Sequence, residues 1–158
     1  MNSFRFYVDY VIHVLASHSR HGTHSPFVYQ LVDEVIYAPR KLDEPSAKVQ
    51  RLISRLINRF GPEGFYRIGD PLPIYPMSLV IAEGKDSEAI AMQIGRVWPQ
   101  FRRGGVLILV GLYRDRRMKE LWCTIQERPD VTVTIDLFHL GLVFLREGQA
   151  KENFRIRF

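Results

Sequence analysis

Two short apolar runs, residues 78–82 and 106–110, constrain the fold of this chain more than any other feature. Both runs are rich in aliphatic side chains and lack the polar alternation of a strand that faces water on one side. Strands of this kind occur in parallel sheets whose two faces are covered by helices. The stretch 78–111 therefore predicts a strand–helix–strand unit with a right-handed crossover.

The segment between the two runs has the pattern of an amphipathic helix. Asp86 or Ser87 can accept a hydrogen bond from a free N–H group of the first turn and so cap its start. Pro99 and the pair Gly104 and Gly105 are expected to end this helix and turn the chain back. The apolar side chains that fall near one helical face are Ile90, Ile94, Val97, Trp98 and Phe101.

The length of 158 residues suits one domain with a buried core, and the net charge of +5 permits a polyanionic partner. The single cysteine, Cys123, cannot form an intramolecular disulfide and favours a reducing compartment. Arg5 and Asp9 interrupt the first apolar stretch, which does not fit a signal peptide. No stretch approaches the ~20 apolar residues that span a membrane. We therefore expect a cytoplasmic protein without a membrane partner.

Three amphipathic helices are predicted in the N-terminal part of the chain. Ser25 and Pro26 fit the cap and the first position of the second helix. Residues 38–46, with two prolines and alternating charges, form the expected linker. We predict a helical extension over residues 1–44, packed on the domain or on a partner, and an α/β domain over residues 45–158. The apolar stripe of the first helix consists of Phe4, Tyr7, Val8, Val11, Ile12 and Leu15.

The C-terminal third is predicted to complete the sheet. Residues 131–138 and 140–146 favour two strands joined by a tight turn at His139, which makes them antiparallel neighbours. Aromatic and aliphatic side chains alternate with arginine over residues 154–158, as in a half-exposed edge strand. An amphipathic helix precedes these strands, with Asp115 near its start. Its apolar side chains are Met118, Leu121, Trp122 and Ile125.

Three segments resemble bacterial class I S-adenosylmethionine-dependent methyltransferases: residues 21–29 (HGTHSPFVY), 131–147 and 154–158 (FRIRF). The subgroup that they resemble carries an N-terminal helical extension with a His-Gly-x-His-Ser-Pro-Phe segment. Together with the central unit, the resemblance covers most of the chain. It implies a truncated Rossmann-like, methyltransferase-type three-layer α/β sandwich. Its mostly parallel sheet would end in a C-terminal antiparallel hairpin and be preceded by N-terminal helices.

By this comparison, one half of a cofactor site is missing. Residues 64–69 (GFYRIG) predict the first strand, with Arg67 where the resemblance implies an acidic residue. Gly69 is retained, but Asp70 is followed by a proline-rich segment that cannot be helical. A short connection then leads into residues 78–82, which resemble the fourth strand of the family. The second and third strands, and the acid that would hold the ribose hydroxyls, have no counterpart.

The other half of the implied site is altered as well. The segment 83–86 (EGKD) stands where the subgroup has Asp-Gly-Asn-His, so an acidic group is kept at Glu83. Val110 and Gly111 replace paired aspartates, and Tyr113 replaces a histidine. A divalent cation needs several oxygen ligands, so we expect no metal site, no competent cofactor binding and no catalytic residue. The remnant cofactor residues are Gly69, Asp70, Glu83, Gly84 and Asp86.

Three other groups of side chains invite a functional interpretation. His18, His21 and His24 could bind a metal, although the resemblance already accounts for two of them. Cys123, beside Trp122 on a predicted helix, is expected to pack rather than to act as a nucleophile. Basic clusters could form a phosphate-binding face, but no nucleic-acid motif accompanies them, so we expect a solvated surface. These clusters contain Arg102, Arg103, Arg114, Arg116, Arg117, Lys119, Arg155 and Arg157.

The sequence therefore leaves three hypotheses about function. We expect a methyltransferase-like protein that has lost S-adenosylmethionine and metal binding and acts, if at all, through interaction. The first alternative is an active S-adenosylmethionine-dependent methyltransferase whose pocket is completed by a second subunit. The second alternative is a basic nucleic-acid-binding module. Neither substrate nor protein partner can be named from the sequence.

A homodimer is also expected, with its contact at the place where the chain is shortened, around residues 64–77. The strand at residues 64–69 should lie at the edge of the sheet, because residues 70–77 are too few to fold a covering helix. An uncovered edge presents unpaired N–H and C=O groups, which proteins rarely leave open to water. Prolines in the connection blunt part of this edge and argue for a monomer. The apolar faces of the N-terminal helices argue for a partner.

Overall fold

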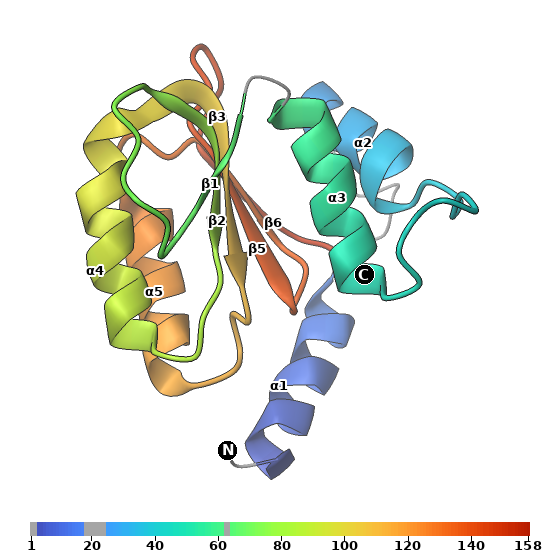
Figure 1. Ribbon diagram of the computed structural model, residues 1–158. Helices are drawn as coiled ribbons and strands as arrows, with labels where there is room; N and C mark the ends of the chain where they lie inside the picture. Colours follow the sequence, from blue (N-terminus) through green and yellow to red (C-terminus); the bar gives the residue numbers. More distant parts are fainter. Residues whose placement is uncertain (1–2, 18–24, 62–63) are drawn as a thin grey trace.

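The computed structural model describes residues 3–17, 25–61 and 64–158, which form a three-layer α/β fold around a mixed six-stranded sheet (Figure 1). The strand order is β1-β2-β3-β5-β4-β6. Successive pairings show that β5 runs opposite to the other strands, which share one direction. The strands are β1 (Tyr66–Arg67), β2 (Met77–Ala82), β3 (Phe101–Val110), β4 (Val133–Asp136), β5 (Leu140–Phe144) and β6 (Glu152–Arg155).

Helices cover both faces of this sheet. In Figure 1, α4 and α5 lie on one face and α2 and α3 on the other, while α1 projects below the sheet. The α-helices are α1 (Ser3–Ala16), α2 (Pro26–Leu31), α3 (Lys48–Phe60), α4 (Ser87–Val97) and α5 (Arg116–Glu127). A π-helical turn, η2 (Val32–Ile36), continues α2, and a 3-10 turn, η3 (Trp98–Gln100), follows α4. None of these helices in the described ranges is long and apolar enough to cross a membrane.

The expected helix caps are confirmed. The Asp86 carboxylate accepts hydrogen bonds from the backbone N–H groups of Glu88 and Ala89, at 2.9 and 3.2 Å. Asp115 caps α5 through the N–H group of Met118, at 2.9 Å. Each cap satisfies donors that the first helical turn leaves free. The same side chains consequently have less capacity to bind a ligand.

The strands β2 and β3 form the centre of the molecule, as the two apolar runs predict. Their alternating side chains enter two separate apolar cores, one on each face of the sheet. The core against α2 and α3 contains Leu79, Ile81, Val106 and Ile108, and the core against α4 and α5 contains Val80, Ala82, Leu107 and Leu109. All eight side chains are at most 1% exposed. Apolar residues of α2, such as Leu31, belong to the first core.

The structure corrects the predicted turn before the second run. The strand β3 already begins at Phe101, which pairs with Met77, whereas the pairing resumes between Val106 and Leu79 after a register shift. Gly104 lies inside this bulge with a φ of 80°, a conformation that glycine adopts without strain. Phe101, which the helical spacing placed on the apolar face of the preceding helix, therefore belongs to the strand. Two glycines that predicted a turn instead form an irregularity within β3.

The hairpin prediction and the two edge positions are confirmed, but β6 covers Glu152–Arg155, so it begins and ends earlier than the predicted residues 154–158. The strand β1 lies at one edge of the sheet and β6 at the other, and β4 and β5 are antiparallel neighbours. The strand at the first edge is shorter than predicted, because only Tyr66 and Arg67 pair with β2. Gly64 and Gly69, with φ angles of 120° and 106°, lie on either side of it. The regular extended pairing therefore stops after two residues.

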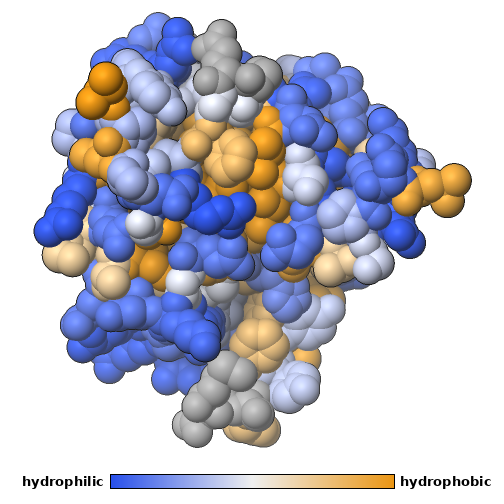
Figure 2. Space-filling model, viewed as in Figure 1, coloured by the Kyte–Doolittle hydropathy of each residue, from blue (hydrophilic) through white to orange (hydrophobic). Residues whose placement is uncertain are grey.

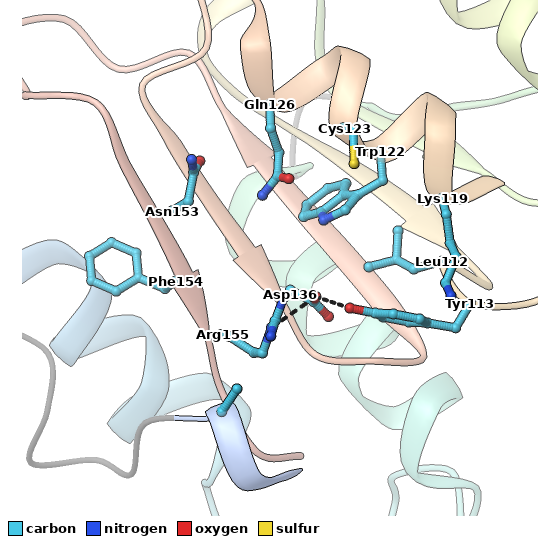
Figure 3. Close-up of a pocket in the computed structure, with 11 residues that line it drawn as sticks. Leu112, Tyr113, Lys119, Trp122, Cys123, Gln126, Asp136, Asn153, Phe154 and Arg155 are labelled. Carbon is cyan, nitrogen blue, oxygen red and sulfur yellow. Dashed lines mark hydrogen bonds and ion pairs between the residues drawn. The ribbon is translucent and has the colours of Figure 1, made fainter. Parts of the chain in front are cut away.

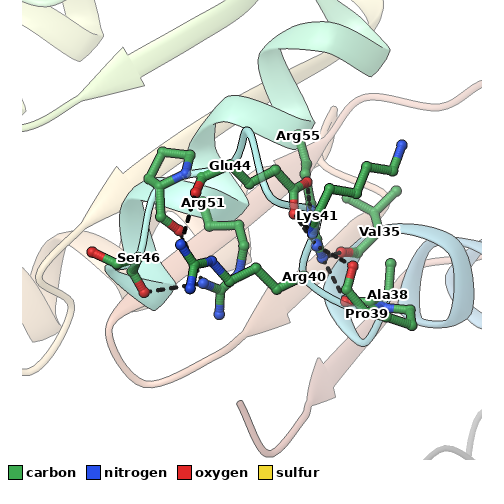
Figure 4. Close-up of polar contacts among 10 residues, drawn as sticks. Val35, Ala38, Pro39, Arg40, Lys41, Glu44, Ser46, Arg51 and Arg55 are labelled. Carbon is green, nitrogen blue, oxygen red and sulfur yellow. Dashed lines mark hydrogen bonds and ion pairs between the residues drawn. The ribbon is translucent and has the colours of Figure 1, made fainter.

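Two arginines of α3 hold the linker at residues 38–46, Arg51 through the carbonyl groups of Pro45 and Ser46 and Arg55 through a larger set of contacts (Figure 4). The guanidinium of Arg55 donates to both carboxylate oxygens of Glu44, at 2.6 and 2.7 Å. It also donates to the backbone carbonyl groups of Val35, Ala38 and Pro39, each at 2.9 Å. These hydrogen bonds replace backbone partners that an irregular segment would otherwise lack. The hydrogen bonds from Arg55 and from the N–H group of Lys41 lower the pKa of Glu44 from 4.5 to about 2.

This pKa shift predicts that the free energy of unfolding depends on pH in the acidic range. Because the folded protein binds the Glu44 proton less readily than the unfolded chain, the contribution is fully present above about pH 4.5 and is lost as the pH falls toward about 2. We expect Glu44→Gln to lower the free energy of unfolding at neutral pH and to lose this difference near pH 2. Urea denaturation across that range measures the effect. Asp43→Asn, an exposed neighbour, is the matched control, and an equal pH slope in wild type and Glu44→Gln would contradict the assignment.

Gly141 in β5 allows Trp122 of α5 to lie directly on the sheet. A Cβ atom at residue 141 would lie 2.5 Å from Cζ3 of Trp122 and 2.9 Å from Cδ2 of Leu112. Trp122 is only 5% exposed, so it has little room to move away. We expect Gly141→Ala to lower the free energy of unfolding by about 1–3 kcal/mol, the usual cost of overpacking.

Chemical denaturation measures this cost against a second glycine variant. Gly95 lies within α4, and no atom would lie within 4 Å of an added Cβ. Gly95→Ala should therefore raise the free energy of unfolding by roughly 0.5–1 kcal/mol, because alanine favours the helix. Equal stabilities of the two variants would show that Trp122 does not require Gly141.

Candidate functional site at the carboxyl edge of the sheet

Ligands of open α/β sheets bind outside the carboxyl ends of the strands. The structure brings the five predicted remnant residues to this edge, because β1 and β2 are parallel neighbours and end side by side. Gly69 and Asp70 follow β1, whereas Glu83, Gly84 and Asp86 follow β2. Their contacts within the chain decide what they can still bind.

Arg67 and Glu83 neutralise each other at these strand ends. A guanidinium nitrogen of Arg67 lies 3.1 Å from a carboxylate oxygen of Glu83. Both side chains are about two-fifths exposed, so the ion pair is open to solvent. The retained acid therefore has a cationic partner at the position where the resemblance implies a second acid.

A second cation bridges the loops that follow β2 and β3. Arg114 donates to the backbone carbonyl of Gly84 and to the hydroxyl of Ser87, the latter at 2.7 Å. It also contacts the carboxylate of Asp115 at 3.1 Å, and Ser87 donates to that carboxylate at 2.7 Å. Burial alone would raise the pKa of Asp115, but its hydrogen bonds with Ser87, Met118 and Arg114 hold it below the ordinary value. The loops are thus joined by internal charges and hydrogen bonds.

Two further remnant residues make contacts within the chain, Asp70 through its backbone and Asp86 through its side chain. The N–H group of Asp70 donates to the carbonyl of Arg67 at 3.0 Å, and its own carbonyl accepts from the hydroxyl of Tyr66. Asp86 caps α4, as described above. Within the described ranges, no three His, Cys, Asp or Glu side chains are grouped so that they could hold a metal ion. The metal candidates His18, His21 and His24 lie outside those ranges.

A polar cluster that the sequence did not predict lies at the other half of this edge (Figure 3). Asp136, at the end of β4, is only 3% exposed. It accepts a hydrogen bond of 2.6 Å from the hydroxyl of Tyr113, and its second carboxylate oxygen lies 3.1 Å from Nε2 of His13 in α1. The guanidinium of Arg155 in β6 lies 3.6 Å away, and the N–H group of Phe138 donates at 2.8 Å. Four elements therefore meet at one carboxylate.

The electrostatics of this cluster keep Asp136 ionised. Burial by itself would raise the pKa of Asp136, but the hydrogen bonds from His13, Tyr113 and the Phe138 N–H group hold it below the ordinary value. Burial and the hydrogen bond to Asp136 raise the pKa of Tyr113 well above that of a free phenol. Tyr113 thus stays protonated and donates. The arrangement stabilises the docking of α1.

A cavity of about 350 Å³ opens beside this cluster, between α5 and β6. Trp122 forms part of its apolar wall. Gln126 donates to Thr134 at 3.0 Å and Thr134 donates to Asn153 at 2.7 Å, which fixes the polar rim. Cys123 also lines the cavity, from the exposed side of α5. The cavity can admit a small molecule.

Only part of this cluster had a signal in the sequence. An aspartate at the end of an apolar strand, such as Asp136, is a recognisable feature of sites in α/β sheets. His13 gave no such signal, because it lies on the polar side of a helix whose apolar stripe points elsewhere.

Comparisons with known protein families, with curated proteins and with solved structures find no match to this chain.

The contacts of Asp136 predict that neutralising this carboxylate lowers the stability of the protein. We expect Asp136→Asn to lower the free energy of unfolding by about 2–3 kcal/mol, because it removes the charge that pairs with His13 and Arg155 in a buried setting. Thermal and urea denaturation measure the loss. Asp43→Asn, in the exposed linker, should change stability by less than about 0.5 kcal/mol. A similar small effect of Asp136→Asn would show that α1 is held without this carboxylate.

Proposed function

We propose that this protein is a methyltransferase-like α/β protein that does not bind S-adenosylmethionine or a metal competently and acts through interaction, as a homodimer. The ion pair between Arg67 and Glu83 carries this proposal. In the methyltransferases that the sequence resembles, the first strand ends in an acidic residue. Here the corresponding strand end bears a cation that binds the one acid retained opposite it.

The sheet topology supports the same conclusion. The strand that would carry the ribose-binding acid should lie beyond β1, but in the described residues β1 is the edge of the sheet. Arg114 also joins the loops after β2 and β3, where a ligand at the carboxyl edge would need space. The hairpin of β4 and β5 fits the arrangement that the resemblance implies. The residues present therefore fit the fold of such an enzyme and do not fit its cofactor.

The pairing of several basic side chains argues against a nucleic-acid-binding face. Arg103 pairs with Glu147 at 2.7 Å, and Arg116 pairs with Glu120 at 2.7 Å. Arg117 pairs with Glu88, which belongs to the neighbouring helix. Cations that are already paired release few counterions from a phosphate backbone. The basic clusters are accordingly interpreted as a solvated surface.

Isothermal titration calorimetry with S-adenosylmethionine tests the proposal. We expect no saturable heat at cofactor concentrations up to about 1 mM, because the acid that would hold the ribose is absent and Glu83 is paired. The titration is run at high protein concentration, so that a pocket completed by a second subunit would also be detected.

A low-micromolar dissociation constant would contradict the proposal and favour an active methyltransferase. In that case Glu83→Gln separates two origins of the heat. Loss of binding in this variant would show that the retained acid still holds the cofactor. Unchanged binding would place the cofactor elsewhere on the protein.

A further inference from the structure

The helix α1 has two faces of opposite character. Its inner face is attached to the domain by Phe6, Asp9 and His13. The ring of Phe6 lies 5.0 Å from that of Phe138, and Asp9 binds the ammonium group of Lys119 at 2.5 Å. His13 contacts Asp136, as described above. The inner face is therefore polar and aromatic.

The outer face of α1 is apolar and open to solvent. It corresponds to the stripe predicted from the sequence, and the structure shows that this stripe does not pack on the domain in the described residues. Figure 2 shows apolar side chains on the part of the surface that α1 forms. The exposed fractions are Phe4 81%, Tyr7 65%, Val8 40%, Val11 54%, Ile12 53% and Leu15 79%. A contiguous apolar face of this kind marks an interaction site.

We propose that this outer face binds the same face of a second copy, with the two α1 helices antiparallel across a two-fold axis. This inference rests on the homodimer of the proposed function and identifies the surface through which the two copies would bind. Both copies present the same surface in such an interface, so that surface must be complementary to itself. Three properties of α1 meet this requirement.

The first property is the spacing of the stripe. Positions 4, 8, 11 and 15 are separated by alternating steps of four and three residues, which is the spacing of the contact positions in paired helices. The stripe is also symmetric about the midpoint between residues 9 and 10. In an antiparallel pair, Phe4 therefore meets Leu15 of the second copy and Val8 meets Val11, while Tyr7 meets Ile12. Each apolar side chain has an apolar partner.

The second property is the position of charge. The stripe contains no ionisable group apart from the phenol of Tyr7, because Asp9 lies on the inner face, bound to Lys119. Arg5 lies beside the stripe near one end of the helix. Antiparallel packing places the two Arg5 side chains at opposite ends of the contact, whereas parallel packing would bring these like charges together. Antiparallel helix dipoles also attract each other.

The third property is the available area. The 14 residues of α1 form a helix about 21 Å long. Aromatic side chains can bury about 150–250 Å² each, so the exposed parts of the two aromatic and four smaller aliphatic side chains offer on the order of 600 Å² per copy. A pair that covers most of this surface buries about 1,000 Å² in total, which reaches the lower limit for a specific interface.

The open edge of the sheet is a poorer interface than α1. Only Tyr66 and Arg67 form β1, and Pro71, Pro73 and Pro76 follow in the adjoining segment. Short edge strands and prolines are devices that prevent pairing with another sheet. Ile74, fully exposed in this segment, provides a probe of the edge.

Sedimentation equilibrium of the full chain and of three variants tests the inference. We expect the wild-type chain to be a dimer. The dissociation constant of Val8→Asp should be at least 100-fold larger, because two unpaired carboxylates would enter the contact. Ile74→Asp at the sheet edge and Met92→Asp on the exposed side of α4 should dimerise like wild type. All three positions are exposed, so each variant should fold, and circular dichroism checks this.

The register has its own test. Val8→Glu combined with Val11→Lys should restore dimerisation relative to Val8→Glu combined with Val11→Glu, because residues 8 and 11 face each other only in the antiparallel pair. Equal behaviour of the two combinations would overturn this register. A dimer that is broken by Ile74→Asp and not by Val8→Asp would move the interface to the sheet edge and overturn the inference. A monomer at high micromolar concentration would overturn both inference and homodimer, while the cofactor titration tests the loss of binding separately.

Discussion

Burial of both faces of β2 and β3 is the constraint on which the rest of the structure depends. A strand pair without a polar face cannot reach solvent on either side, so helices must cover both. On one side α4 and α5 serve this purpose, and they come from the same stretch of chain as the strands. On the other side the cover comes from α2 and α3, which precede the sheet in sequence. The helices α2 and α3 are thus part of the core, whereas α1 is not.

The sequence predicted most of this arrangement because the signals are local. Apolar runs gave β2 and β3, helical periodicity gave the helices, and Asp86 and Asp115 marked two of their starts. The bulge in β3 was missed, because a pair of glycines has the same local preferences in a turn and in a bulge. Helical spacing likewise identified an apolar stripe on α1, but spacing alone does not say what covers a stripe.

The candidate site was predictable only where parallel pairing dictates proximity. Once β1 and β2 are neighbours, the residues that follow them must lie together, and Arg67 reaches Glu83 as a consequence. The Asp136 cluster depends instead on contacts between distant residues. His13 and Asp136 are 123 positions apart, and no local pattern predicts that α1 ends against the hairpin of β4 and β5. Such contacts are set by tertiary packing alone.

The two faces of α1 explain how a short helix can be attached to the domain and still present an apolar surface to a second copy. An isolated helix of 14 residues is marginally stable in water, so α1 depends on the groups that hold it. On the inner face these are a buried carboxylate, an ion pair and aromatic edges, which fix position and direction with little apolar area. The apolar area therefore stays on the outer face. Covering that face would bury the side chains that the domain leaves exposed, so pairing of two copies would further stabilise the docked helix α1.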